Sequence, residues 1–454
     1  MNTTDRSLFF SGIGGSGLSA IARFMAARGN RVSGSDRAFD KNPDHPALDA
    51  LRMCGITMYP QDGSGVTPQT DMLVFSTAVE PDQPELVKAR KLNIPSMTRP
   101  DYLAALSTDF RSLAVAGTSG KSTTSGMLAF LMERLGMHPS FIGGGRVKQF
   151  RTADNPGNSL SGVSDFLVIE ACESDGSIVH YRPEHTIVLN LDLDHHSISE
   201  TASMFRILLD NTRGSCVLNA DDLHLAPFRS KAAATFSLDA PSDYRAENLI
   251  LQPLESSFTV RDIPFRLSLP GRYNVMNALA CIALLGEMGI QPDAVAEVLP
   301  AFTGIERRFD IHVNTAEHLV VDDYAHNPHK IASMMQAVQL IRPALCYLFQ
   351  PHGYGPTRMM KNEYIAAFAE NLRASDHLIL LPIYYAGGTA QKDISSDEIA
   401  RGVAVQGKSA ESVTTRKEVL DRIAEWQNYI IFGARDESLS AFAASIADKI
   451  RQRT

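Results

Sequence analysis

The sequence lacks the features that mark several classes of protein. It has no dense block of Lys and Arg, and its 43 basic and 51 acidic residues give a formal charge of −8. This balance argues against nucleic acid as the main partner. No apolar run approaches the ~18 residues needed to span a bilayer, so no membrane partner is expected. Residues 1–7 also lack the basic segment and apolar core of a signal peptide.

Cysteine is scarce, and its placement argues against both zinc sites and disulfide bonds. The chain has five cysteines, Cys54, Cys172, Cys216, Cys281 and Cys346. They are odd in number and widely scattered, so they predict neither zinc-binding pairs nor a disulfide framework. This usage favours a reducing, cytoplasmic location.

The length and the periodicity of the chain predict several α/β domains. A chain of 454 residues is too long for one core, and about three domains are expected. In residues 1–108, apolar runs alternate with helical stretches in a βαβ pattern, which is typical of a parallel sheet. The predicted strands there are 7–13, 31–35 and 72–77, with a helix at 17–27. The sequence leaves the oligomeric state open between monomer and homodimer.

Two further stretches show the same alternation. In residues 109–303, strands are predicted at 113–116, 166–169 and 186–189, and helices at 123–135 and 274–288. Residues 237–269 within this stretch are predicted to be irregular or to form antiparallel strands. In residues 304–454, strands are predicted at 319–322, 345–349, 378–381 and 429–432.

A glycine-rich turn lies between Gly117 and Ser122, where the chain reads Gly-Thr-Ser-Gly-Lys-Ser. It follows a predicted strand and opens a predicted helix. Backbone N–H groups in such a turn cradle phosphates, while Lys121 would reach the outer phosphates and Ser122 a Mg²⁺ ion. The common pattern has a glycine where Val115 stands, so this shorter form indicates a narrower set of ATP users. An ordinary strand-to-helix turn is the alternative, but it gives no reason for Lys and Ser together.

A second glycine cluster, Gly12-Ile-Gly14-Gly-Ser-Gly17, follows the first predicted strand and opens the first predicted helix. It satisfies the G-x-G-x-x-G pattern, and Asp36 stands about where an acid that binds a ribose belongs. The turn shows only that a diphosphate can sit on the helix N-terminus. A dinucleotide such as NAD and a nucleotide-sugar diphosphate would both fit, and a purely structural turn is the other alternative.

Acidic residues follow two strands of the middle stretch. Glu170, Glu173 and Asp175 come directly after strand 166–169, and His195 closes the acidic run that follows strand 186–189. Carboxylates at the C-terminal end of a strand face the crevice where α/β sheets bind ligands, and they suit Mg²⁺. The alternative for the acids is a solvated loop. His195 could be a metal ligand, a phosphate contact or a surface switch.

Polar clusters recur further along the chain. Asn274 opens a predicted helix and could cap it or read an adenine edge. The pair Arg307-Arg308 could clamp a phosphate or be a solvated basic pair. His326 and His352 each follow a predicted strand, in loops that could also be plain. These clusters converge only if the domains close on one another.

In their order, these motifs resemble the Mur ligase family, the ATP-dependent amide ligases of bacterial cell-wall synthesis. The resemblance covers essentially the whole chain and rests on seven motifs, at 12–17, 117–122, 170–177, 190–195, 271–277, 307–309 and 322–328. Within the family, the first motif and the stretch 170–177 look most like the members that join L-alanine to UDP-N-acetylmuramate, although Cys172 stands where those members have Asp. The resemblance implies three α/β domains: a Rossmann-like UDP-sugar-binding domain at 1–108, a P-loop ATPase-like ATP-binding domain at 109–303, and a Rossmann-like amino-acid-binding domain at 304–454.

The resemblance also implies roles for individual residues. The UDP-sugar would bind at Gly12, Gly14, Gly15, Ser16, Gly17, Ser35, Asp36, Ser76 and Thr77. ATP would bind at Gly117, Thr118, Ser119, Gly120, Lys121, Ser122, Thr123, Asn274, Arg308 and Asp323. Mg²⁺ would be held by Ser122 and Glu170, and a second ion by His195. The residues implied in catalysis are Lys121, Glu170, His195, Arg308 and His326, the last beside the incoming amino acid.

The implied chemistry is phosphorylation of a carboxylate by ATP, followed by attack of an amino group on the acyl phosphate. Positive charge from Lys121, Arg308 and two Mg²⁺ ions would offset the repulsion between the two anions. Closure of the third domain over the site would protect the acyl phosphate from water.

Several positions depart from the family pattern. Ser119 and Tyr273 stand where His is usual, Ser122 where Thr is usual, and Asn327 where a second His is common. The stretch 352–356 lacks the Arg residues that help to place the amino acid's carboxylate in the alanine-adding members. The amino substrate is therefore open between L-alanine, another amino acid and a small peptide. A peptide-recycling ligase and a nucleotide-binding paralogue without ligase activity are the alternatives. A dehydrogenase is disfavoured, because the second phosphate turn has no place in it.

Overall fold

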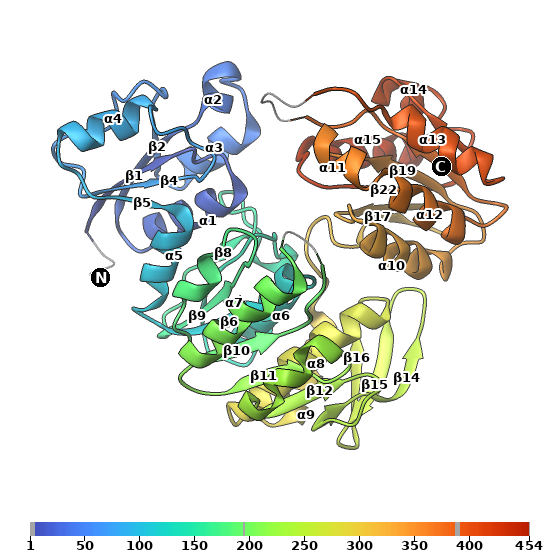
Figure 1. Ribbon diagram of the computed structural model, residues 1–454, viewed down its shortest axis with the longest axis horizontal. Coiled ribbons are helices and arrows are strands. Elements are labelled where there is room, and N and C mark those ends of the chain that lie inside the picture. Colours follow the sequence, from blue (N-terminus) through green and yellow to red (C-terminus); the bar gives the residue numbers. More distant parts are fainter. Residues whose placement is uncertain (1–4, 194–195, 386–390, 454) are drawn as a thin grey trace. The chain divides into compact units, whose positions relative to one another are not determined.

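The structure is a computed structural model that describes residues 5–193, 196–385 and 391–453. It divides into two compact units. Unit 1 comprises Met1–Leu251 and Glu255–Gly304, and unit 2 comprises Gln252–Leu254 and Ile305–Thr454. Both units combine helices with largely parallel sheets, which confirms the predicted α/β class (Figure 1). The predicted division of residues 1–303 into two domains, at 1–108 and 109–303, falls inside unit 1 and stays a prediction.

The first sheet of unit 1 is parallel throughout, in the Rossmann-like strand order β3-β2-β1-β4-β5. Its strands are β1 (Ser7–Ser11), β2 (Arg31–Ser35), β3 (Thr57–Met58), β4 (Met72–Phe75) and β5 (Ser96–Thr98), and its helices are α1 (Ser16–Ala27), α2 (Arg37–Lys41), α3 (Pro46–Met53), α4 (Pro84–Lys91) and α5 (Arg99–Ser107). The strand order reverses at β1, and open α/β sheets bind ligands at the carboxyl edge of such a point. The strand predicted over 7–13 ends at Ser11, because Gly12 turns the chain with a φ of 81°.

The second sheet of unit 1 has the order β13-β12-β11-β10-β6-β9-β7-β8, and only the pair β7–β8 is antiparallel. Its strands are β6 (Arg111–Ala116), β7 (Ser140–Ile142), β8 (Ser159–Leu160), β9 (Phe166–Glu170), β10 (His185–Val188), β11 (Cys216–Asn219), β12 (Ala234–Ser237) and β13 (Tyr244–Arg245). The central strand β6 is buried from Leu113 to Ala116, as its continuous apolar run predicts. The strands β9 and β10 flank it, so the loops after these three strands lie at one edge of the sheet.

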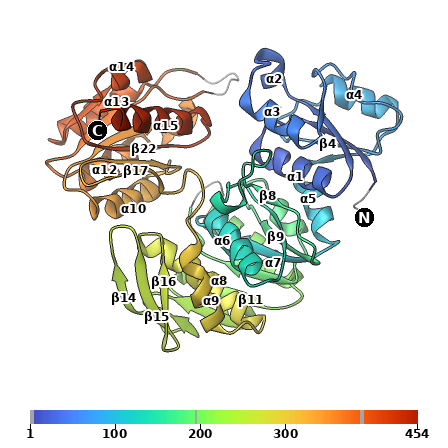
Figure 2. The same cartoon turned by 180° about the vertical axis from the view of Figure 1, so that it is seen from behind.

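Helices and a small antiparallel sheet complete unit 1 (Figure 2). The helices are α6 (Lys121–Arg134), α7 (Ile198–Asn211), α8 (Arg272–Glu287) and α9 (Pro292–Val298), with 3₁₀ turns η1 (Lys148–Phe150), η2 (Ser177–His180), η3 (Leu223–Lys231) and η4 (Leu299–Ala301). The antiparallel strands β14 (Glu247–Leu251), β15 (Ser256–Val260) and β16 (Ile263–Leu267) confirm the prediction of antiparallel strands within residues 237–269.

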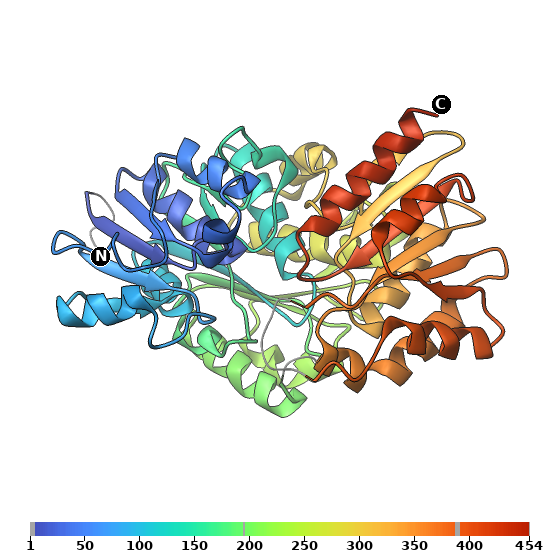
Figure 3. The same ribbon diagram turned by 90° about the horizontal axis from the view of Figure 1, so that it is seen from above.

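Unit 2 contains a sheet of order β17-β18-β22-β19-β20-β21, in which β17 alone is antiparallel. Its strands are β17 (Asp310–Asn314), β18 (Leu319–Asp323), β19 (Cys346–Gln350), β20 (His377–Leu380), β21 (Ala410–Ser412) and β22 (Asn428–Gly433), and its helices are α10 (Pro328–Gln339), α11 (Tyr354–Met359), α12 (Lys361–Asn371), α13 (Ser396–Val405), α14 (Arg416–Asp421) and α15 (Ser438–Arg451). One hydrophobic core joins α10, α12 and α13 to the sheet, and a second core joins α14 and α15 to it. Helix α15 is the red helix that ends near the C-terminus in Figure 3.

Two expectations from composition can be compared with the structure. All five cysteines carry free thiols, of which Cys216, Cys281 and Cys346 are buried. Across the described ranges, no helix combines the length and the apolar character that crossing a membrane requires.

Candidate active site

The turn at Gly117–Gly120 connects β6 to α6, as the sequence predicts. Gly117 and Gly120 have φ values of 139° and 86°, which side chains disfavour. Both are also closely packed: a Cβ on Gly120 would lie 2.7 Å from Asn277 Oδ1, and one on Gly117 would lie 3.0 Å from Leu189 Cβ. Helix α6 begins at Lys121, two residues earlier than predicted, so Lys121 and Ser122 occupy its first turn.

Asn190, which follows β10, holds this turn in place. Its Oδ1 accepts hydrogen bonds from Thr118 Oγ1 and Ser119 N, both at 2.8 Å, and its Nδ2 donates to Ser119 O at 3.1 Å. Asp192 N donates in turn to Thr118 Oγ1 at 3.0 Å. The sequence places Asn190 in a motif but assigns it no role. The only signal for this role is its position after a strand beside β6.

The last residue of β9 and the loop after it face the start of α6 with two carboxylates. Ser122 Oγ donates to Glu170 Oε2 at 3.1 Å, and Gly144 N donates to Glu170 Oε1 at 2.7 Å. Lys121 Nζ lies 2.8 Å from Glu173 Oε2. Burial lowers the pKa of Lys121, but the nearby acidic groups, led by the Glu173 carboxylate, together more than offset this effect, so the pKa is raised and the side chain carries a positive charge. The solvated-loop alternative is therefore wrong for Glu173, which is 2% exposed.

The third carboxylate of this region contacts the start of α5. Asp175 Oδ2 accepts a hydrogen bond from Arg99 at 2.6 Å, and Asp175 Oδ1 accepts from the backbone and side chain of Ser177. A Cβ on Gly17 would lie 3.2 Å from Arg99 Cδ, so the glycine allows Arg99 to approach the start of α1. Nothing in the sequence pairs Arg99 with Asp175, because 76 residues separate the two.

The residues expected to hold the UDP-sugar surround the turn after β1. Gly12 N donates to Ser35 O at 2.8 Å, and Gly15 N to Gly12 O at 3.4 Å. Asp36 accepts from Gly14 N and Ala38 N, both at 2.8 Å, so both carboxylate oxygens already receive backbone hydrogen bonds. The remaining predicted residues are Ser16 and Gly17 in α1, and Ser76 and Thr77 just after β4.

Ser35 and Ser76 differ in how they are placed. Ser35 is fully buried, and its hydroxyl donates to Glu85 at 2.8 Å. Ser76 is partly exposed, and its Cβ would lie 3.1 Å from a Cβ on Gly12. The role of both residues in binding a UDP-sugar stays a prediction.

Asn274 and Thr123 lie in helices of the same unit. Asn274 is 4% exposed, and its Nδ2 donates to Pro270 O at 2.8 Å. Helix α8 has Gly271 at its N-cap with no side-chain cap, so Asn274 is not the helix cap that the sequence allowed. Thr123 is buried in the first turn of α6.

In unit 2, the two adjacent arginines have different environments. Arg307 is 4% exposed and donates to Gly433 O at 2.8 Å and Asp436 O at 3.0 Å. Arg308 is partly exposed, and its guanidinium lies 4.7 Å from the centre of the Tyr324 ring. The solvated-pair alternative is therefore wrong for Arg307, which is part of the core, while Arg308 reaches the surface.

The end of β18 brings Asp323 and His326 near this arginine. Asp323 accepts from Phe309 N and Ala325 N, both at 2.7 Å, while burial raises the pKa of its carboxyl. Burial, followed by the charge of Lys330, lowers the pKa of His326 to about 3, so its ring is neutral at pH 7. The His326 ring packs edge-on against His352 at 5.4 Å.

The residues suited to a metal ion are oxygen donors at the start of α6. Ser122 Oγ and Glu170 Oε2 lie together beside the phosphate turn, and such oxygens fit Mg²⁺, which is bound through one or two carboxylates and substrate phosphates. In the described part of the chain, no group of three or more His, Cys, Asp or Glu could hold a metal ion alone. His195, expected as a second ligand, lies outside the described residues.

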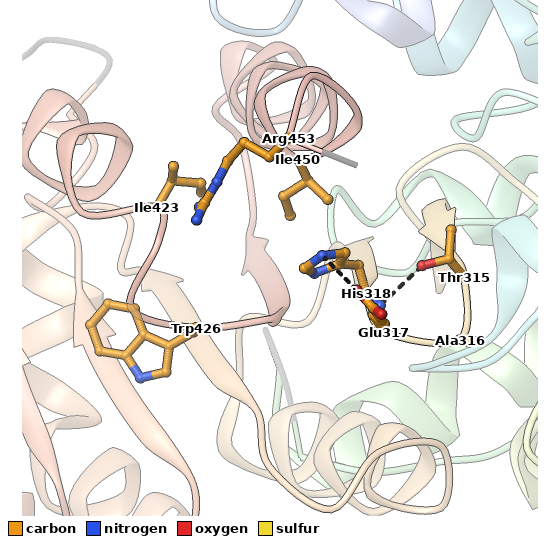
Figure 4. A pocket seen from close by; sticks show the side chains of 8 residues that line it. All are labelled: Thr315, Ala316, Glu317, His318, Ile423, Trp426, Ile450 and Arg453. Carbon is orange, nitrogen blue, oxygen red and sulfur yellow. Dashed lines mark hydrogen bonds and ion pairs between the residues drawn. The ribbon is translucent and has the colours of Figure 1, made fainter.

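A separate cavity of about 520 Å³ opens in unit 2 (Figure 4). Its lining includes His318, at the start of β18, and Trp426, before β22, so it lies at the edge of the sheet opposite to His326. The Trp426 ring is stacked on His377 at 4.9 Å. None of the predicted site residues lines this cavity.

Comparisons with known proteins agree with the motifs. Three family models match: the Mur ligase family catalytic domain at residues 8–111, the Mur ligase middle domain at 115–285, and the Mur ligase glutamate ligase domain at 307–448. A UDP-N-acetylmuramate–L-alanine ligase of Xylella fastidiosa is 34% identical, over 94% of this chain and 92% of its own length. The corresponding ligase of Nitrosomonas eutropha is 32% identical, over 89% of this chain and 88% of its own.

Solved structures show the same fold. The crystal structure of a UDP-N-acetylmuramate-alanine ligase from Thermotoga maritima has a TM-score of 0.82 and 26% identity, covering 99% of this chain and all of the other. A murein peptide ligase from Psychrobacter arcticus has a TM-score of 0.69 at 21% identity, covering 98% of each chain, and supports the fold alone. From the family models and the curated relatives together, the chain belongs to the Mur ligase family.

Proposed function

We propose that this protein joins L-alanine to the carboxylate of UDP-N-acetylmuramate, with cleavage of ATP, in the synthesis of peptidoglycan. The names of the curated relatives support this reaction. The observation that carries the proposal is the arrangement at the start of α6, where Lys121 faces Glu173 and Ser122 faces Glu170. Such a turn places a cation and a metal-binding pair beside bound phosphates.

The charges at this turn indicate that ATP needs a divalent cation. Lys121 contributes one positive charge, and Glu170 and Glu173 lie within hydrogen-bond distance of the first residues of α6 with one negative charge each. The three groups sum to −1, which would repel a triphosphate. Mg²⁺ held at Ser122 and Glu170 would reverse this sign and neutralise charge that develops on the phosphates.

The residues of the chain divide the work of the proposed reaction. Lys121 would bind the outer phosphates of ATP and hold them toward the sugar's carboxylate, which attacks the γ-phosphate. Arg308 would add positive charge from unit 2, and Asp323 would bind the ribose. The neutral ring of His326 would lie beside the incoming amino group, which displaces phosphate from the acyl phosphate and leaves the amide.

We further infer that the nine residues named above around Gly12–Gly17 and at the ends of β2 and β4 bind the UDP-sugar. We also propose a cytoplasmic location, which the free cysteines support. The three-domain division at residues 108 and 303 remains part of the same proposal.

The test is phosphate release by the purified protein with ATP, Mg²⁺ and UDP-N-acetylmuramate. Release is expected only when L-alanine is added, and a panel of other amino acids and a tripeptide completes the experiment. Release with the tripeptide and not with L-alanine would replace the proposed amino substrate. No release with any amine would contradict ligase activity itself.

A further inference from the structure

Glu173 is a buried carboxylate for which the proposed chemistry gives no role. Its side chain is 3% exposed, and both of its oxygens lie near Lys121 Nζ, at 2.8 Å and 3.1 Å. Burying a carboxylate is costly unless it is paired with a cation. Its position beside the phosphate turn therefore calls for an explanation beyond packing.

The three carboxylates at the end of β9 and in the loop after it have separate partners. Glu170 is bonded to Ser122 Oγ and Gly144 N, and Asp175 is bonded to Arg99. Glu173 alone contacts Lys121 with both oxygens. The end of β9 therefore provides one carboxylate on the metal side of the turn, and the loop after it provides a different one on the lysine.

The contacts of Lys121 fix where its ammonium group lies. Lys121 Nζ donates to Gly117 O and to Glu173, so the phosphate turn holds it on one side and the acidic loop on the other. A lysine side chain is long and flexible, and ordering it costs conformational entropy. Because phosphoryl transfer depends on exact positions of charge, a preordered ammonium group favours the reaction.

We propose that Glu173 is a positioning residue for phosphoryl transfer, which holds Lys121 Nζ where the outer phosphates of ATP react. This inference rests on the proposed function. The carboxylate is itself negative and repels the phosphates, so it does not contribute to the affinity for ATP. Glu173 therefore acts on the rate of phosphoryl transfer through Lys121, and affinity in the ground state does not depend on it.

The test compares Glu173→Gln with wild type in two measurements. The dissociation constant of ATP with Mg²⁺ is measured by calorimetry, and kcat by phosphate release with UDP-N-acetylmuramate and L-alanine. The variant is expected to bind ATP at least as tightly as wild type and to turn over at least tenfold more slowly. Glu184→Gln is the matched control, because Glu184 faces two arginines just before β10, at the opposite edge of the same sheet, and both measurements should stay within twofold.

Two results would overturn the inference. One is a kcat of Glu173→Gln within threefold of wild type. The other is a loss of ATP affinity that parallels the loss of kcat and of thermal stability, as expected of a merely structural residue. If wild type itself releases no phosphate, the proposed function fails, and the affinity measurement still tests the inference: binding more than threefold weaker in Glu173→Gln contradicts it.

Discussion

Replacing Lys121 by Met should destabilise unit 1 in the absence of any nucleotide. The Lys121 and Glu173 side chains are 13% and 3% exposed, so the substitution leaves a carboxylate buried without its cation. Removing one partner of a buried ion pair typically costs about 3–5 kcal/mol. A solvent-exposed pair contributes only about 0–1 kcal/mol, so the two cases are well separated.

Adding Glu173→Gln to Lys121→Met distinguishes loss of the ion pair from loss of packing. Lys121→Met with Glu173→Gln removes both charges, and the double variant should recover most of the stability lost by Lys121→Met. Loss of packing around the lysine stem would instead remain in the double variant.

Urea unfolding followed by far-UV circular dichroism measures the effect. The single Trp of the chain, Trp426, lies in unit 2, so its fluorescence follows the other unit and serves as an internal control. The reasoning is refuted if Lys121→Met costs less than about 1 kcal/mol, the range of an exposed pair. It is also refuted if the double variant is no more stable than the single one.

Three further predictions concern the phosphate turn of unit 1 and His326 of unit 2. Asn190→Ala removes the side-chain bonds that hold the phosphate turn and should weaken ATP binding at least tenfold by calorimetry, with affinity within twofold counting against this role. Gly120→Ala should weaken ATP binding similarly, because its Cβ would lie 2.7 Å from Asn277 Oδ1, whereas Gly136→Ala, at a φ of 75° in open space, should leave binding unchanged. Since the pKa of His326 is about 3 when folded and about 6.5 when unfolded, its contribution to stability is full above pH 6.5 and falls as the pH drops toward 3. NMR of the ring should show no titration between pH 5 and 8, and a midpoint near pH 6.5 would contradict the burial argument.

Local patterns in the sequence predict much of the fold. The strand Arg31–Ser35 is predicted residue for residue, and helix α1 starts one residue before its predicted first residue. These elements are long enough to show their periodicity. The short strands β7, β8, β13 and β21, of two or three residues each, are not predicted, because so few residues carry no pattern.

The pairings at the candidate site could not be predicted, because they depend on the order of strands in the sheet. Asn190 reaches the phosphate turn only since β10 lies beside β6, and Glu173 reaches Lys121 only since β9 lies on the other side. Strand order is a long-range property that residue types and spacing do not encode locally. The sequence likewise cannot tell buried Arg307 from surface Arg308, since both belong to the same short motif.

The most direct test of carboxylate phosphorylation uses UDP-N-acetylmuramate labelled with ¹⁸O in its carboxylate. If the carboxylate attacks the γ-phosphate of ATP, one labelled oxygen stays with phosphorus when the amine forms the amide. The released phosphate should therefore carry one ¹⁸O per amide formed with L-alanine, as measured by mass spectrometry. Amide formation with unlabelled phosphate would contradict the acyl-phosphate route.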